Sequence, residues 1–271
     1  MVDSEPSIEQ ILHFSYVDLL AFMGESNLPP GGFSNIANLI DFCHIHESSR
    51  VLHVGSSAGF LSREIARITG AQVVGVDINP NMVASAQANA EREGLADRCS
   101  YTCSDICTYR SAEPFDIVLT GGSLAFVHDH ASAIRSMVAN AKPYGFVALC
   151  ELFYRESPSP ELRERVASII GNQVPEYDRN YWIELAESCK ELRPWKSDSR
   201  PVRKATDDEL KTYCALMAEW ASGNWSDGAK AALAARILEY MEPFNENMGY
   251  LSAITLAYRH IPTSQEPLLY I

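Results

Sequence analysis

Short apolar runs alternate with amphipathic segments through the middle of the chain. The runs have the length of buried strands, and the segments between them place apolar residues at helical spacing. Strands that alternate with helices in this way predict a doubly wound, mostly parallel, Rossmann-like sheet. The expected strands cover residues 51–55, 72–77, 98–103, 115–120 and 146–153, and the expected helices cover 60–69, 80–94 and 129–141.

Further helices are expected on both sides of this regular region. Residues 7–23 have helical spacing of apolar positions, and a second helix is expected from a Ser34 cap to about Phe42. Beyond the fifth strand the regular alternation stops. The later elements are expected as helices within 157–192 and 206–242, a strand near 195–203 and a long apolar strand over 249–259.

These elements together predict an α/β fold with a seven-stranded sheet and a helical lid inserted between the late strands. We divide the chain into three parts. Residues 1–155 hold the N-terminal helices and the half of the sheet that carries the ligand-binding turn. Residues 156–248 form the largely helical lid, and residues 249–271 supply the final strand and a tail.

The segment Val51–Gly59, VLHVGSSAG, is the most informative motif in the chain. It predicts a buried strand that runs through a small-residue turn into a helix, so the turn backbone can approach a ligand closely. Asp77 ends the next strand about 20 residues later, which is the spacing of a nucleoside-binding β-α-β unit. A carboxylate at that point accepts hydrogen bonds from a ribose diol.

Other polar residues follow the next two strands. Asp105, with Ile106 after it, ends the third strand, and Thr120 and Gly121 end the fourth. The carboxyl ends of parallel strands are where open α/β sheets bind ligands. We therefore expect one cleft along this edge of the sheet.

Over residues 30–155 the chain resembles the class I S-adenosylmethionine-dependent methyltransferases, with 249–259 as a plausible terminal strand. The residues that carry the resemblance are VLHVGSSAG, VVGVD, SDI and FDIVLTGG. The resemblance implies S-adenosylmethionine as cofactor, with Asp77 on the ribose hydroxyls, Asp105 on the adenine amino group and Ile106 on the ring. The whole set of expected cofactor contacts is Gly32, His53, Gly55, Ser57, Gly59, Asp77, Ile78, Asp105, Ile106, Thr120 and Gly121.

Two residues depart from the family pattern. His53 stands where the family has an acid in the first strand, and Ser57 stands where it has the middle glycine of the turn. A neutral histidine holds the methionine amine less firmly than a carboxylate does. These departures predict weaker cofactor binding, or an amine bound instead by Gly32 or Asn35 of the first loop.

The late lid and the long last strand resemble the small-molecule branch of the family. We expect in-line methyl transfer to a small acceptor whose identity and nucleophilic atom the sequence does not specify. The candidates for a general base, which only a protonated acceptor requires, are His128, Asp129 and Glu151, in that order. The acceptor is expected between the ends of the fourth and fifth strands and the lid.

Two alternative functions come from other classes. The first is a binding protein that keeps the fold and its nucleoside ligand without catalysis. The second is a serine hydrolase, because residues 55–59 also fit G-x-S-x-G, with Ser57 as nucleophile and His260 as a late histidine. The turn follows the first strand of the sheet, whereas a nucleophile elbow normally follows several strands, so the hydrolase is the weaker hypothesis.

The amino-acid composition limits the classes of binding partner and ligand that are expected. The formal net charge is −13 over 271 residues, a field that opposes binding to nucleic acid or to an anionic membrane surface. The seven cysteines are odd in number and include no CxxC, and the His-x-His pairs fall near helix ends, so no metal site is expected. A cytoplasmic monomer or homodimer is expected.

Overall fold

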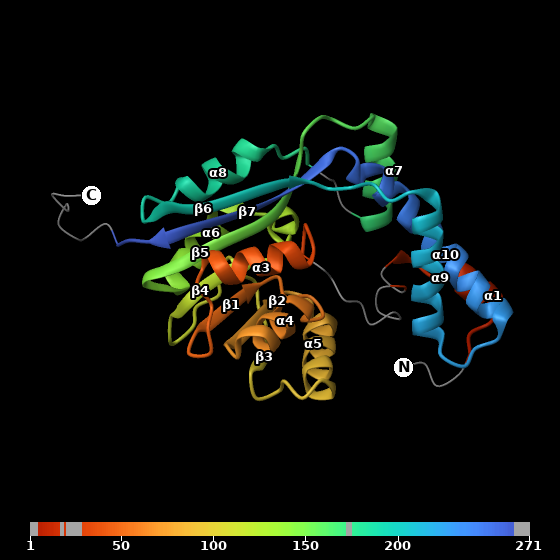
Figure 1. Ribbon diagram of the computed structural model, residues 1–271, viewed down its shortest axis with the longest axis horizontal. Coiled ribbons are helices and arrows are strands. Elements are labelled where there is room, and N and C mark those ends of the chain that lie inside the picture. The colour runs from red at the N-terminus through yellow and green to blue at the C-terminus, as the bar shows by residue number, and fades with distance from the viewer. Residues whose placement is uncertain (1–4, 17–18, 20–28, 172–174, 263–271) are drawn as a thin grey trace. The chain divides into compact units, whose positions relative to one another are not determined.

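The computed structural model describes residues 5–16, 19, 29–171 and 175–262. In this part of the chain, seven strands form one sheet with the order β3-β2-β1-β4-β5-β7-β6 (Figure 1). The strands are β1 (Arg50–Val54), β2 (Gln72–Asp77), β3 (Cys99–Cys103), β4 (Phe115–Thr120), β5 (Ala141–Tyr154), β6 (Leu192–Pro201) and β7 (Leu251–His260). The chain order reverses on either side of β1, as in a doubly wound fold.

The sheet is mixed. The pairs β1–β2, β1–β4, β2–β3 and β4–β5 are parallel. The last strand runs the opposite way, because His260 at its end contacts the carbonyl oxygen of Ala141, which begins β5. Strand β7 is also antiparallel to β6, because Ile261 N, just after the end of β7, donates to Glu191 O, just before the start of β6. The prediction of a mostly parallel, seven-stranded, Rossmann-like sheet is confirmed.

Helices cover both faces of the sheet. The helices of the described residues are α1 (Ile8–Leu12), α3 (Phe33–Phe42), α4 (Phe60–Thr69), α5 (Pro80–Arg92), a 3-10 turn η1 (Leu124–Phe126), α6 (His130–Asn140), α7 (Pro160–Ile170), α8 (Arg179–Glu187), α9 (Asp207–Ser222) and α10 (Asp227–Met248), and those that cover the sheet are α3, α4 and α5 on one face and α6 and α8 on the other. None of these described helices is both long enough and apolar enough to cross a membrane.

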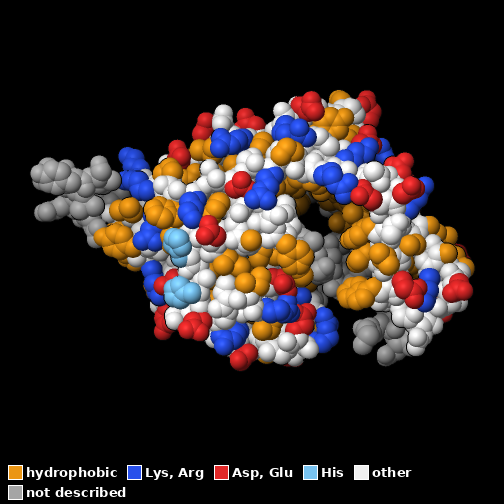
Figure 2. Space-filling model, in the orientation of Figure 1, with side chains coloured by type: hydrophobic (Ala, Val, Ile, Leu, Met, Phe, Trp, Pro, Cys, Tyr) orange, Lys and Arg blue, Asp and Glu red, His pale blue; other side chains and the backbone are white. Residues whose placement is uncertain are grey.

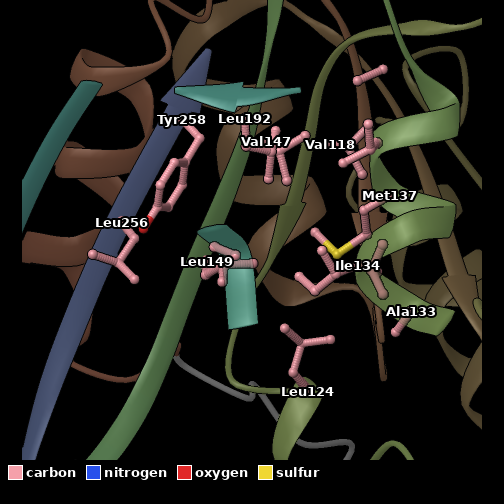
Figure 3. Close-up of a cluster of buried hydrophobic side chains, with 14 of the residues drawn as sticks. Val118, Leu124, Ala133, Ile134, Met137, Val147, Leu149, Leu192, Leu256 and Tyr258 are labelled. Carbon is pink, nitrogen blue, oxygen red and sulfur yellow. The ribbon is translucent and has the colours of Figure 1, made fainter. Parts of the chain in front are cut away.

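Alternating residues of each strand belong to two cores. One core joins α6 and α8 to one face of the sheet and includes Val118, Ile134 and Met137 (Figure 3). The other joins α3, α4 and α5 to the opposite face and includes Ile65 and Ile117. Neighbours such as Ile117 and Val118 point to opposite faces because side chains alternate along a strand.

The described chain divides into two compact units. Unit 1 comprises residues 1–25, 154–176 and 201–252, and its core packs α1, α9 and α10 around residues such as Leu233. Unit 2 comprises residues 26–153, 177–200 and 253–271 and holds the two cores described above. On the face that Figure 2 shows, acidic and basic side chains are intermixed.

Several predicted boundaries need correction. The first helix ends at Leu12 and does not run through to 23, because the Phe14 carbonyl accepts hydrogen bonds from Arg236 and Tyr240. Residues 17–18 and 20–28, part of that prediction and of the loop after it, lie outside the described residues. The cap of α3 is Gly32, with φ 62°, and Ser34 lies inside the helix.

Two strands also differ from the prediction. The fifth strand begins at Ala141, five residues early, because a register shift between Phe115 and Ile117 lets β4 and β5 pair there. The strand expected near 195–203 spans Leu192–Pro201. The strand expected over 249–259 is β7, and the side chains of Asn79 and Thr206 cap α5 and α9.

Helix α4 offers a matched test of the core. Ile65 is fully buried, whereas Ile68, one turn later, is 58% exposed. Ile65→Ala should lower the free energy of unfolding by about 2–5 kcal/mol, because it leaves a cavity. Ile68→Ala should change it by less than about 0.5 kcal/mol. Urea denaturation of both variants measures the difference, and equal effects would contradict the packing of α4 described above.

Candidate cofactor and catalytic site

The turn after β1 is closed against β2. The backbone N–H groups of Gly55 and Ser56 both donate to Val76 O, at 2.8 and 3.0 Å. Gly55 and Gly59 have φ of 65° and 83°. A Cβ at Gly55 would lie 2.2 Å from Ser123 Cβ, and one at Gly59 would lie 2.5 Å from the Tyr101 hydroxyl. Both positions therefore require glycine, for conformation and for space.

Asp77 connects this turn to the next helix. Its Oδ2 accepts a hydrogen bond from Ser57 N at 2.8 Å, and its Oδ1 accepts one from Asn79 N at 2.9 Å. Asn79 in turn caps α5. Each carboxylate oxygen keeps a second lone pair, so the carboxylate is held in place and can still accept from a ligand.

Ser57 adopts the left-handed conformation that the family pattern gives to glycine, with φ 47°. Its backbone N–H bond to Asp77 stabilises this conformation, and its hydroxyl lies 3.8 Å from the Met82 sulfur. The turn therefore accommodates serine.

His53 lies buried beneath the mouth of β4. Its Nδ1 is 2.8 Å from Ser62 Oγ of α4, and its Nε2 would be 3.3 Å from a Cβ at Gly121. Burial lowers the pKa of His53 to about 3, so the ring is neutral. It supplies no charge to a cationic amine.

The loop before α3, which includes Pro29 and Pro30, packs against the end of β4. A Cβ at Gly122 would lie 2.8 Å from Pro30 Cδ, and a Cβ at Gly121 would lie 3.7 Å from Pro29 Cβ. Asn35, which is buried, donates its amide to Pro30 O at 2.5 Å and approaches Cys150 Sγ at 3.5 Å. Asn35 thus fixes the segment that ends in Gly32.

The ends of β2 and β3 hold the residues expected to contact the nucleoside. Asp105 Oδ1 accepts a hydrogen bond from Cys107 N at 2.8 Å. Ile78, beside Asp77, is 69% exposed, whereas Ile106 is buried in the core. Ile78 therefore presents the larger apolar surface to a ring at this edge.

Thr120 and Glu151 form a buried pair at the ends of β4 and β5. The Thr120 hydroxyl donates to Glu151 Oε1 at 2.8 Å, and Leu124 N donates to the same oxygen at 3.4 Å. The other oxygen, Oε2, has no hydrogen-bond partner among the described residues. Burial raises the pKa of Glu151 to about 8, although the Thr120 bond opposes this, so the group is mostly protonated at neutral pH.

Asp129 and His128, both predicted as bases, have different surroundings. Asp129 is the N-cap of α6, and its carboxylate accepts bonds from Ser132 N at 2.9 Å and Ser132 Oγ at 2.5 Å. The Ser132 bonds lower the pKa of Asp129. His128 is exposed, and a ring nitrogen lies within 4.8 Å of an Asp105 carboxylate oxygen and of Cys107 Sγ. The η1 turn therefore brings His128 back toward the end of β3.

An aromatic cluster packs on unit 2 close to this region. His130, Tyr177, Tyr181 and Trp182 have ring centroids 4.1–5.7 Å apart. His130 Nδ1 contacts the Tyr181 hydroxyl, and the Trp182 indole donates to Leu152 O. These four residues are spread over residues 130–182 of the sequence, so no sequence pattern indicated the cluster.

The position of His260 does not support the serine-hydrolase alternative, because His260 does not lie beside Ser57. His260 Nδ1 lies 2.9 Å from Lys142 O, at the start of β5. The turn that holds Ser57 follows the end of β1, which is parallel to the β4–β5 pair. The two residues therefore lie at opposite ends of the sheet.

The fold and the arrangement of this edge are those of the class I S-adenosylmethionine-dependent methyltransferases, a class whose cofactor is S-adenosylmethionine. Residues 51–145 match the family described as a methyltransferase domain. A ubiquinone biosynthesis O-methyltransferase of Bradyrhizobium diazoefficiens is 34% identical over 103 residues, 38% of this chain and 40% of the relative. The match thus spans well under half of that relative's length.

Solved structures show the same fold over more of the chain. The MccD protein has a TM-score of 0.71 at 22% identity, covering 86% of this chain and 99% of its own. A phosphoethanolamine N-methyltransferase 2 of Haemonchus contortus, solved with S-adenosyl-L-methionine, has a TM-score of 0.68 at 19% identity. That similarity covers 95% of this chain and 60% of the other.

Glu151 should make stability depend on pH. Its folded-state pKa of about 8 exceeds the ordinary value of 4.5, so its contribution is fully present below pH 4.5 and is lost as the pH rises toward 8. Between pH 6.5 and 8 the wild type should lose about 1–2 kcal/mol of unfolding free energy relative to Glu151→Gln. Urea denaturation at both pH values measures this loss, and parallel curves for the two proteins would contradict it.

Proposed function

We propose that this protein transfers a methyl group from S-adenosylmethionine to a small-molecule acceptor. The observation that carries the proposal is the fixed Asp77 carboxylate, which is bonded to both the glycine turn and the start of α5. The sulfonium methyl is already activated, so the protein mainly has to align the nucleophile, the methyl carbon and the sulfur.

The proposed cofactor position follows the carboxyl ends of the strands. Gly55, Ser57 and Gly59 pass under the methionine part, Asp77 accepts from the ribose hydroxyls, and Asp105 accepts from the adenine amino group. The lone pairs left on Asp77 and the exposed face of Ile78 support this placement. The methionine amine would lie near Gly32 and Gly121.

The acceptor is proposed to lie at the mouth of β4, on the side of η1. The relatives' names include methylation at oxygen and at nitrogen. We therefore propose only that the acceptor is a small molecule. The first experiment is a screen of phenols, amines and carboxylic acids, in which release of S-adenosylhomocysteine is measured. Release above the no-acceptor rate with none of them would count against catalysis.

A non-catalytic binding protein is the second candidate. It is favoured by the neutral, buried His53 at the position where the family has an acid. Calorimetric binding of the cofactor without turnover of any acceptor would support this alternative. Binding and turnover together would support the transferase.

Asp77→Asn should weaken S-adenosylhomocysteine binding by about 1–3 kcal/mol, roughly 5- to 150-fold, because the amide is a weaker acceptor for two ribose hydroxyls. Isothermal titration calorimetry measures the dissociation constant. Asp97→Asn is the matched control, since Asp97 is an exposed acid outside the strand ends. Equal affinities for Asp77→Asn and the control would remove Asp77 from the site.

His128→Ala should lower kcat by about 10²–10⁴-fold for an acceptor that must lose a proton, if the ring acts as the base. The dissociation constant of the cofactor should stay within about twofold of the wild-type value. Steady-state kinetics across pH 6–9 and calorimetry separate the two quantities. An unchanged kcat with weaker cofactor binding would place His128 on the nucleoside side, next to Asp105.

A further inference from the structure

Three side chains with different donor atoms converge beside the ends of β3 and β4. Asp105 and Cys107 lie in the turn after β3, and His128 lies between η1 and α6. A carboxylate oxygen, the Cys107 sulfur and a ring nitrogen all lie within 4.8 Å of one another. Carboxylate, thiolate and imidazole are the ligand types that zinc prefers. We propose that these three side chains bind a divalent cation of the zinc class.

The turn that carries two of the ligands is already ordered by its own hydrogen bonds. The Asp105 carbonyl accepts from Thr108 N at 3.1 Å and from Tyr109 N at 2.9 Å. Its carboxylate accepts from Cys107 N at 2.8 Å. These bonds fix the Asp105 and Cys107 backbones with respect to each other, so a cation meets two ligands on one rigid turn.

The third ligand can close on the cation. With bonds of about 2.0–2.3 Å, the ligand atoms of a tetrahedral zinc site lie roughly 3.3–3.8 Å apart. The present separations, which are within 4.8 Å, exceed this by at most about 1.0–1.5 Å. His128 is exposed, and its ring can move that far without disturbing a core. Three protein ligands leave the fourth position to water.

The local charge favours a cation. The Asp129 carboxylate is held by Ser132, and its charge adds to that of Asp105. Arg135 on α6, which donates to Ser132 Oγ at 2.9 Å, places one positive charge beside Asp129 and offsets part of this effect. The formal charge of the chain is −13. Binding breaks the Cys107 S–H bond, forms a sulfur–metal bond and releases the proton to solvent.

The cation should compete with the cofactor, a consequence that rests on the proposed function. Asp105 is proposed to accept the adenine amino group, and the same carboxylate is a ligand of the cation. A lone pair donated to a metal is no longer available to an N–H donor. Zinc-class cations should therefore act as reversible inhibitors of cofactor binding.

Cobalt(II), titrated into the full, reduced, cofactor-free chain, tests the site directly. We expect a thiolate-to-cobalt charge-transfer band with the wild type and with Cys103→Ser. Cys103 is the matched control, because it is an exposed cysteine that ends β3. The band should disappear in Cys107→Ser, and His128→Gln should bind cobalt at least about tenfold more weakly. No band in the wild type, or a band that persists in Cys107→Ser, would overturn the site.

The variants must be folded for this test to decide. Circular dichroism of each variant provides that check, and His128→Gln changes an exposed side chain, so it tests the site even if Cys107→Ser unfolds. Wild-type affinity in a folded His128→Gln protein would remove His128 from the ligand set and overturn the three-ligand site.

S-adenosylhomocysteine is then added to the cobalt-loaded protein. We expect the band to fade at concentrations that saturate the metal-free protein in calorimetry. A band that survives saturation overturns the competition and leaves the proposed function intact. A metal-free protein that gives no heat with S-adenosylhomocysteine contradicts the proposed function, while the cobalt band alone still establishes the cation site.

Discussion

The Asp77 carboxylate is the interaction on which the candidate site depends. One oxygen holds Ser57 N in the turn after β1, and the other holds Asn79 N at the start of α5. A charged acceptor makes both bonds stronger than neutral ones would be. They join two consecutive β-α units at their ligand-binding ends, and the first bond stabilises Ser57 at positive φ. Loss of this carboxylate would loosen the glycine turn as well as remove the proposed contact with the ribose.

Burial keeps two titratable side chains uncharged inside the same edge of the sheet. His53 lies beneath β4 against α4, and Glu151 lies across the sheet beside η1. Desolvation lowers the pKa of the first and raises that of the second, so both are mainly uncharged at neutral pH. The charged acids, Asp77 and Asp105, are at the rim. A cationic cofactor would therefore meet its negative charge at the nucleoside end of the cleft and not beneath its sulfonium.

Sequence patterns predicted those parts of the molecule that local physical rules determine. The strands followed from short apolar runs, and the helices between them followed from the helical spacing of apolar positions. The start of α3 was wrong because a serine cap was favoured over Gly32. The first helix was too long because its end depends on Arg236 and Tyr240, more than 200 residues away in the chain.

The site was predictable to the level of strand ends and no further. Asp129 was proposed as a base, but its bonds to Ser132 are those of a helix cap, a pattern that the order Asp-x-x-Ser could have indicated. The approach of His128 to Cys107 could not be foreseen, because it depends on the path of η1. The side-chain surroundings of Asn35 were likewise hidden, since Pro30 and Cys150 come from different segments.

The packing of the first loop limits how a small molecule could approach β4. Pro30 lies so close to Gly122 that a Cβ there would collide with it, and Pro29 lies at van der Waals distance from a Cβ at Gly121. Asn35 fixes Pro30 in that place. This packing occupies the side of the β4 mouth next to α3. The acceptor is therefore proposed to approach from the η1 side, where Glu151 lies beneath the backbone and His128 is exposed.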